Sequence, residues 1–319
     1  MRFDTGRVQP LHRIGRIALI ALGCTAVAIP PCRAWNDLGH MTVAAIAYAD
    51  LTPAARARSG ALLRLNPDYA SWIRNVPTPQ RDRTAFLEAS NWPDAIKHSH
   101  AYRNDGERPS GPGADRNTGY ADRLQHRYWH FIDVPLSRDG VRGPAPLAPN
   151  VETQIARFRR TLSSPSVSDE VKSYDLVWLL HLVGDIHQPL HTVSRYSREQ
   201  PEGDAGGNRV RLCAPPCRLE LHAFWDDLLG HARRPEAALR LAQRMPRAPE
   251  QLASVSDESS WVRESVEIAR DVVYGPPIGP GAGPYPLTTA YREHAREIAR
   301  RRIALAGARL ARLLNSALR

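Results

Sequence analysis

The sequence is poor in cysteine. Only four cysteines occur among 319 residues, and two of them, Cys24 and Cys32, lie near the start of the chain. The remaining pair is too small for a disulfide-rich scaffold or a four-thiolate zinc site. Cys213 and Cys217, in Cys-Ala-Pro-Pro-Cys, predict a disulfide across a short turn if the protein is exported, with a zinc-binding pair as the alternative.

Long apolar runs are also missing. The run 17–29 has 13 residues, whereas a membrane-spanning helix needs about 20. A basic leader precedes this run, and small residues stand at the minus-three and minus-one positions of a cut after Ala34. We therefore expect residues 1–34 to be a cleaved signal peptide, with an uncleaved membrane anchor as the alternative, and residues 35–319 to form a single domain.

Acidic residues are fewer than basic ones. The whole chain has 43 Lys and Arg against 33 Asp and Glu, a net charge of +10. Residues 1–34 hold five Arg and one Asp, so residues 35–319 have 38 basic and 32 acidic residues, a net charge of +6. This excess suits an anionic substrate, and it is equally consistent with a basic surface kept for solubility.

Strand signals are scarce, and most of the chain after Trp35 has helical periodicity. One β-hairpin is expected from 209–212 and 218–221, with its turn at two prolines. The sequence therefore predicts an all-α, single-domain, multi-helix fold with a small β-hairpin. We expect helices at 40–51, 54–65, 84–91, 150–162, 168–186, 222–230, 235–244, 256–273 and 287–314, and Gly- and Pro-rich loops at 102–119 and 275–286.

Histidine and aspartate are concentrated in a few short segments. His181 and Asp185 stand four residues apart, so they share one face of a helix, and Pro189 can turn the chain so that His191 returns to the same centre. His222 and Asp226 form a second pair at the same spacing.

Three further candidates are Asp94, His40 and the pair His130 and Asp133. Imidazole and carboxylate are the ligands that zinc takes when thiolates are absent. A single helical pair is more often an ordinary hydrogen bond, but two pairs with an adjoining histidine favour a metal site. Apolar and aromatic neighbours also indicate that these histidines are buried and need partners.

Six motifs occur in one order along the chain. The chain resembles the zinc-dependent, single-strand-specific nucleases of fungi and plants, which share a fold with bacterial zinc phospholipase C. The resemblance covers 35–226. Its motifs are Trp35-Asn-Asp-Leu-Gly-His40, Trp92-Pro-Asp94, His130-Phe-Ile-Asp133, the run His181 to His191, Gly206-Gly-Asn208 and His222-Ala-Phe-Trp-Asp226.

The resemblance implies three zinc ions. The first would be held by Asp94, His130, His181 and Asp185, and the second by His191, His222 and Asp226. The third would take the free amine and carbonyl of Trp35, with His40 and a bridging Asp185. Signal cleavage would then be part of building the site.

The resemblance also implies substrate contacts. Asp94 and Asp185 would be catalytic carboxylates. Lys97, three residues after Asp94, would steady the phosphate, with a solvated lysine as the alternative. Phe131 would stack on a base, with core packing as its alternative, and Asp133 and Asn208 would bind the edge of that base. His187 is expected to lie behind the ligands or at the surface. The remaining histidines, His98, His100, His126, His231 and His294, are expected at the surface or in hydrogen bonds.

The implied activity is hydrolysis of single-stranded DNA and RNA to 5′-phosphate products, with dephosphorylation of 3′-nucleotides as a further expectation. No Asn-x-Ser/Thr sequon occurs and only one disulfide is expected, whereas eukaryotic members of this family often carry glycosylation sites and further disulfides. This suggests a bacterial protein that is periplasmic or secreted, and a monomer is the default expectation. One alternative is a phospholipase C acting on lipid headgroups, although in those enzymes the last helical motif typically ends in Glu rather than in an aspartate such as Asp226. The other alternative is a non-catalytic zinc-stabilised binding protein.

Overall fold

The computed structural model describes residues 1–3, 35–213 and 216–319, so most of the predicted signal peptide lies outside the described residues. Helices dominate the described chain, and the prediction of an all-α fold is confirmed. The α-helices are α1 (Asp37–Ala49), α2 (Pro53–Leu63), α3 (Tyr69–Trp72), α4 (Arg81–Ala89), α5 (Trp92–Ala95), α6 (Val151–Ser163), α7 (Asp169–Asp185), α8 (Leu221–Asp226), α9 (Pro235–Ala242), α10 (Glu250–Ala253), α11 (Glu258–Ile268) and α12 (Thr289–Ala317).

Shorter helical segments connect these helices. Five are 3₁₀ turns and one is a π-helical segment that continues α11. They are η1 (Thr78–Gln80), η2 (Ile96–His98), η3 (Gly119–Ala121), η4 (Arg127–Trp129), η5 (Pro189–His191) and the π-helical η6 (Ala269–Val273).

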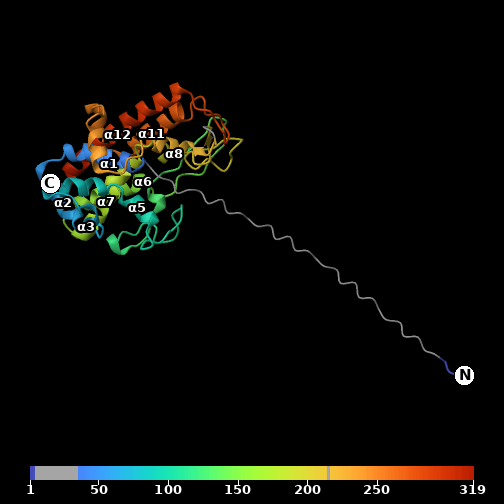
Figure 1. Cartoon of the computed structure of the whole chain (residues 1–319), viewed down its shortest axis with the longest axis horizontal. Helices are drawn as coiled ribbons and strands as arrows, with labels where there is room; N and C mark the ends of the chain where they lie inside the picture. Colours follow the sequence, from blue (N-terminus) through green and yellow to red (C-terminus); the bar gives the residue numbers. More distant parts are fainter. Residues whose placement is uncertain (4–34, 214–215) are drawn as a thin grey trace. The chain divides into compact units, whose positions relative to one another are not determined.

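Helix α7 forms the centre of the fold. Ser168 caps its first turn by accepting a hydrogen bond from the backbone N–H of Val171. From Lys172 to Asp185 every residue is buried, and α7 packs against α1, α2, α6 and α12. Figure 1 shows α7 within the helical layers, with α11 and α12 on one side and α2 and α3 on the other. A helix that is buried all round can present polar side chains to an enclosed centre.

Helices α1 and α12 pack closely. A Cβ atom at Gly307 would lie 2.6 Å from Cβ of Ile46, so a larger residue there would push the helices apart. This contact fixes the position of α1, which carries His40.

Two small sheets complete the fold. The hairpin is present: β3 (Arg211–Leu212) pairs antiparallel with β4 (Leu219–Glu220). The sequence did not predict the parallel pair of β1 (Val134–Leu136) and β2 (Val193–Arg195). This pair joins the segment after His130 to the segment after His191.

Among the helix boundaries that differ from the predictions, two lie beside candidate ligands. Pro93 lies within the first turn of α5, where proline is tolerated, instead of only ending the preceding helix. The predicted helix 222–230 ends at Asp226. Among the described residues, no helix is both long and apolar enough to cross a membrane.

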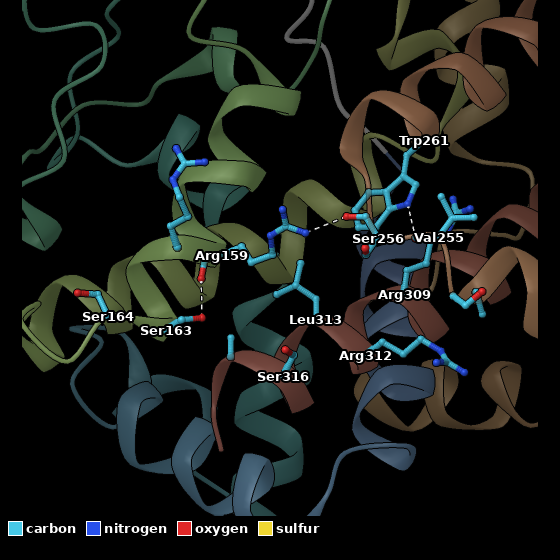
Figure 2. A pocket seen from close by; sticks show the side chains of 14 residues that line it. Arg159, Ser163, Ser164, Val255, Ser256, Trp261, Arg309, Arg312, Leu313 and Ser316 are labelled. Atoms are coloured by element: carbon cyan, nitrogen blue, oxygen red, sulfur yellow. Dashed lines mark hydrogen bonds between the residues drawn. The ribbon is translucent and has the colours of Figure 1, made fainter.

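A pocket lies between α6, α11 and α12, where Arg159, Trp261 and Leu313 line it (Figure 2). Arg159 crosses toward Ser256 and donates to its carbonyl oxygen at 2.8 Å. The candidate ligands of the histidine–aspartate groups do not line this pocket.

Candidate functional site

Three groups of histidine and aspartate side chains gather around the end of α7. Within each group the possible ligand atoms lie within 4.8 Å of one another. Asp94, His130 and His181 form the first group, His191, His222 and Asp226 the second, and His40, His181 and Asp185 the third. Eight of the nine predicted metal ligands therefore fall into these groups.

His181 and Asp185 connect the first and third groups from successive turns of α7. The Nδ1 atom of His181 lies 2.7 Å from the carbonyl oxygen of Ser90. A carbonyl only accepts, so Nδ1 carries the proton and Nε2 presents a lone pair. That Nε2 lies 3.4 Å from Oδ2 of Asp185 and 3.7 Å from Oδ1 of Asp94. The backbone thus fixes His181 in the tautomer that binds a metal through Nε2.

Asp94 from α5 and His130 from the end of η4 complete the first group. Asp94 lies in the first turn of α5, and His130 directly follows η4. The Nδ1 atom of His130 lies 3.0 Å from Nε2 of His181 and 3.0 Å from Oδ2 of Asp185. Its Nε2 atom is buried with no hydrogen-bond partner.

His40 belongs to the third group. It projects from α1 and stacks on His181, with ring centroids 3.8 Å apart, and its Nε2 atom lies 3.4 Å from Oδ1 of Asp185. Gly184 makes room for this ring, because a Cβ atom at position 184 would lie 2.7 Å from Nδ1 of His40. Both ring nitrogens of His40 are buried without a hydrogen-bond partner, which costs free energy unless another group binds them.

The second group gives the clearest test of whether a cation fits. Nδ1 of His191 lies 2.8 Å from the carbonyl oxygen of His130, and Nδ1 of His222 lies 2.6 Å from the carbonyl oxygen of Gly206. Both carbonyls accept, so in the neutral rings both Nε2 atoms carry lone pairs. These two Nε2 atoms are 3.0 Å apart. Facing lone pairs repel unless a proton or a metal ion lies between them, and two imidazole nitrogens beside a carboxylate are a donor set that fits a metal ion.

The glycines of the Gly206-Gly-Asn208 motif allow this arrangement. Gly206 has a φ of +61°, and a Cβ atom there would lie 2.5 Å from the carbonyl oxygen of Leu190. Glycine alone adopts this backbone without strain. The tight turn brings the Gly206 carbonyl to His222.

Burial keeps three of these histidines, His40, His130 and His181, neutral. Desolvation, followed by the charge of His181, lowers the pKa of His40 well below its usual value. Desolvation and the charge of Lys97 do the same for His130, and burial lowers the pKa of His181 to about 4. The neutral imidazole is the form that binds metal.

Asp94 stays ionised in the same surroundings. Burial would raise its pKa, but Lys97 and then the neighbouring histidines hold the pKa well below its usual range. The Nζ atom of Lys97 lies 2.7 Å from Oδ1 of Asp94, and its side chain is 3% exposed. Lys97 is therefore a buried cation beside the first group and not a solvated surface lysine.

Trp35 is fully buried at the start of the described domain. The next residue, Asn36, donates its backbone N–H to the carbonyl oxygen of Asp226 at 3.4 Å and caps α1 with its side chain. This contact ties the Trp35–Asn36 backbone to α8, which carries two residues of the second group. The role of the Trp35 amine and carbonyl as metal ligands stays a prediction.

Phe131 and Asp133 line one pocket of about 170 Å³, together with Tyr128, Tyr196 and Arg108. Burial, and then the charge of Asp204, raises the pKa of Asp133 to about 6. Phe131 is half-buried and faces this pocket, although it also packs against the core.

Asn208 is not among the residues that line this pocket. Its side-chain amide donates to the carbonyl oxygen of Ala205 at 2.8 Å, within the turn that presents Gly206. A role for Asn208 in substrate binding stays a prediction.

His126 is buried and not at the surface. Its Nδ1 atom lies 3.1 Å from a carboxylate oxygen of Asp105, and its Nε2 atom lies 3.1 Å from one of Asp122. Burial opposes its charge, but these carboxylates raise its pKa. His126 thus anchors the loop before η4, and the spacing of Asp122 four residues earlier was the only sequence signal for this contact.

The disulfide between Cys213 and Cys217 is present, as predicted.

His187 is fully buried. It lies behind the ligands, where its Nε2 atom accepts a hydrogen bond from Arg309 at 2.8 Å.

The fold and the site define an all-α protein whose buried centre carries three adjoining groups of His and Asp side chains. The S1/P1 Nuclease family matches residues 35–319. The chain therefore belongs to the S1/P1 nuclease family, and the resemblance predicted from the six motifs is confirmed.

Curated relatives match a shorter part of the chain. Endonuclease 3 of Arabidopsis thaliana is 26% identical over 207 residues, which cover 61% of this chain and 54% of that protein. Nuclease S1 of Aspergillus oryzae is 28% identical over 203 residues, which cover 60% of this chain and 53% of that protein. Nuclease P1 of Penicillium citrinum is 25% identical over 205 residues, which cover 62% of this chain and 61% of that protein. The chain spans little more than half the length of these relatives.

Proposed function

We propose that this protein is an exported, zinc-dependent endonuclease that hydrolyses phosphodiesters of single-stranded DNA and RNA. The observation that carries the proposal is the pair of facing Nε2 lone pairs on His191 and His222, 3.0 Å apart, beside two further groups that share His181. Family membership adds support, because Nuclease S1 and Nuclease P1 are among the relatives.

The three groups would hold three zinc ions, with Asp185 shared between the first and the third. When bound, zinc supplies Lewis acidity toward a phosphoryl oxygen and lowers the pKa of a bound water to about 7. The chain's own residues orient the ligands, and burial keeps the imidazoles of His40, His130 and His181 neutral. Lys97 places a buried positive charge beside Asp94, where it stabilises the negative charge that a phosphate gains in the transition state.

The pocket of Phe131 and Asp133 supports the preference for unpaired nucleic acid. An aromatic ring offers a face for a base, and a carboxyl offers hydrogen-bonding oxygens to its edge. Bases within a duplex are stacked and cannot enter such a pocket. We expect cleavage to leave 5′-phosphates and to accept both DNA and RNA. We also expect the mature enzyme to be a periplasmic or secreted monomer.

A comparison of substrates tests this function. The mature protein is incubated with a single-stranded oligonucleotide, with the same sequence as a duplex, and with phosphatidylcholine vesicles. We expect rapid cleavage of the single strand alone, loss of activity with EDTA and recovery with zinc. Cleavage of the lipid without release of nucleotides, or activity that survives EDTA, would contradict the proposal.

Changing Lys97 to Met is expected to lower kcat by about 10²- to 10³-fold, the range seen when a transition-state donor is removed. The zinc content at neutral pH should not change, because Lys97 forms a hydrogen bond with Asp94 and is not itself one of the candidate metal ligands. Lys97 is the main group that lowers the pKa of Asp94, so its loss raises that pKa. The acid limb of the pH–activity curve should therefore move to higher pH.

The other lysine, Lys172, is buried to the same degree and provides the control. Lys172→Met should leave both kcat and the pH profile unchanged. Equal losses in the two variants would show that Lys97 acts only through folding.

Changing Gly184 to Ala is expected to lower the affinity for one zinc ion by about 10- to 100-fold. This is the usual effect of a change that displaces a ligand without removing it. The new Cβ atom would lie 2.7 Å from Nδ1 of His40 and would displace that ring. His181 stacks on the same ring and limits how far it can move. Titration with a competing chelator measures the affinity. Gly60→Ala on α2, where the atoms nearest to the new Cβ belong to the carboxylate of Asp82, should bind zinc as the wild type does. Wild-type affinity in Gly184→Ala would contradict the assignment of His40.

A further inference from the structure

Gln188 is a fully buried amide at the turn between α7 and η5. It stands between Asp185 and His191 but belongs to none of the three histidine–aspartate groups. Its Oε1 atom accepts a hydrogen bond from the backbone N–H of Leu190 at 2.6 Å. This contact caps η5, the short segment that ends at His191.

The other end of the same amide reaches a different part of the chain. The Nε2 atom of Gln188 donates to Oδ1 of Asp226 at 2.7 Å. The second carboxylate oxygen, Oδ2, lies 3.6 Å from Nε2 of His222. Gln188 thus holds Oδ1 and leaves Oδ2 on the side of the carboxylate that faces the histidine.

The turn itself does not depend on Gln188. The hydroxyl of Ser265 donates to the carbonyl oxygen of Ile186 at 2.6 Å, and Nε of Arg302 donates to the carbonyl oxygen of His187 at 3.2 Å. These contacts come from α11 and α12 and tie down the two residues before Gln188. Loss of the amide therefore leaves residues 186 and 187 anchored and removes the two links that the amide makes, to the backbone N–H of Leu190 and to Asp226.

We propose that Gln188 is a positioning residue that orients the carboxylate of Asp226 and, through η5, the ring of His191, and so sets the affinity of the second group for its metal. Side chains that hydrogen-bond to metal ligands typically change affinity by about 10- to 100-fold when they are removed. The inference rests on the proposed function, because it assumes that His191, His222 and Asp226 hold a zinc ion.

The test uses Gln188→Met, which has nearly the same length but cannot donate or accept. The zinc-loaded protein is titrated with a competing chelator, and bound zinc is counted by native mass spectrometry. We expect one of three zinc ions to bind about 10- to 100-fold more weakly, with the other two unchanged. The matched control is Gln154→Met, since Gln154 is equally buried but donates to Asp115; it should keep all three affinities.

A double variant identifies which zinc ion is affected. His222→Ala removes a ligand of the second group, so adding Gln188→Met to it should cause no further loss of zinc. Additive losses, unchanged affinity in Gln188→Met, or equal weakening in Gln154→Met would overturn the role of Gln188. A wild-type protein that binds no zinc would instead overturn the proposed function.

If Gln188→Met does not fold, Gln188→Asn keeps the amide but is one methylene too short to span both partners. It should fold and show the same selective loss. Wild-type zinc affinity in this variant would also overturn the proposal.

Discussion

Asp185→Asn is expected to abolish detectable nuclease activity and to remove two zinc ions of three. The two oxygens of this fully buried carboxylate face different groups. Oδ1 lies 3.4 Å from Nε2 of His40, and Oδ2 lies 3.0 Å from Nδ1 of His130. An amide lacks the negative charge that offsets two adjacent cations, and its NH₂ group cannot act as a ligand. The loss of activity should exceed the roughly 100-fold upper range for residues that only support a ligand.

The control for this variant lies on the same helix. Asp175 is also fully buried in α7, but it accepts a hydrogen bond from Asn117 at 2.6 Å and belongs to no metal group. Burial raises the pKa of Asp175 to about 7, so a neutral amide is a mild change there. Asp175→Asn should retain three zinc ions and most of the activity. Retention of all three zinc ions by Asp185→Asn would disprove the bridging role.

The second large effect is expected from a single residue added before Trp35. If the free amine of Trp35 is a ligand, an alanine extension replaces it with an amide nitrogen, which is a poor ligand because its lone pair is delocalised. The third zinc ion should then be lost and activity should fall by more than about 100-fold, since a direct ligand is removed. The second zinc ion shares no ligand with the third and should remain.

The same alanine placed after Arg319 provides the control for this extension. Arg319 is exposed, so the addition should change neither zinc content nor activity. An N-terminally extended protein with three zinc ions and full activity would show that the Trp35 amine is not a ligand. The full precursor should resemble the extended protein and be poorly active.

Local signals predicted much of the fold. Ser168 and Asn150 begin α7 and α6 as expected, because their side chains satisfy free backbone N–H groups of the first turn. The four-residue spacing of His181 and Asp185 placed both on one face of α7, and the structure agrees. These features depend on neighbours within one helical turn, so the sequence alone carries them.

Contacts between distant segments were not predictable in the same way. The strands β1 and β2 have three residues each, too few to show a period, and their pairing depends on where η5 turns the chain. The tautomers of His191 and His222 are set by carbonyl oxygens of His130 and Gly206. Backbone carbonyls occur at every residue, so no residue type in the sequence marks them as partners.

Gln188 was missed for a related reason. A glutamine beside a proline has many ordinary explanations, and only the folded chain shows that its amide joins Leu190 to Asp226. For His126 the sequence left open a surface position or a hydrogen-bonded one, because the partner Asp105 lies in a Gly- and Pro-rich loop, where periodicity gives no position. Burial of polar groups is decided by tertiary partners and not by residue type.

Native mass spectrometry of the exported protein tests the central claim most directly, because one spectrum reports both the first residue and the number of bound metal ions. The proposed site predicts a chain that begins at Trp35 and carries three zinc ions. A chain that begins upstream of Trp35 while fully active, or one that carries a single zinc ion, would contradict it.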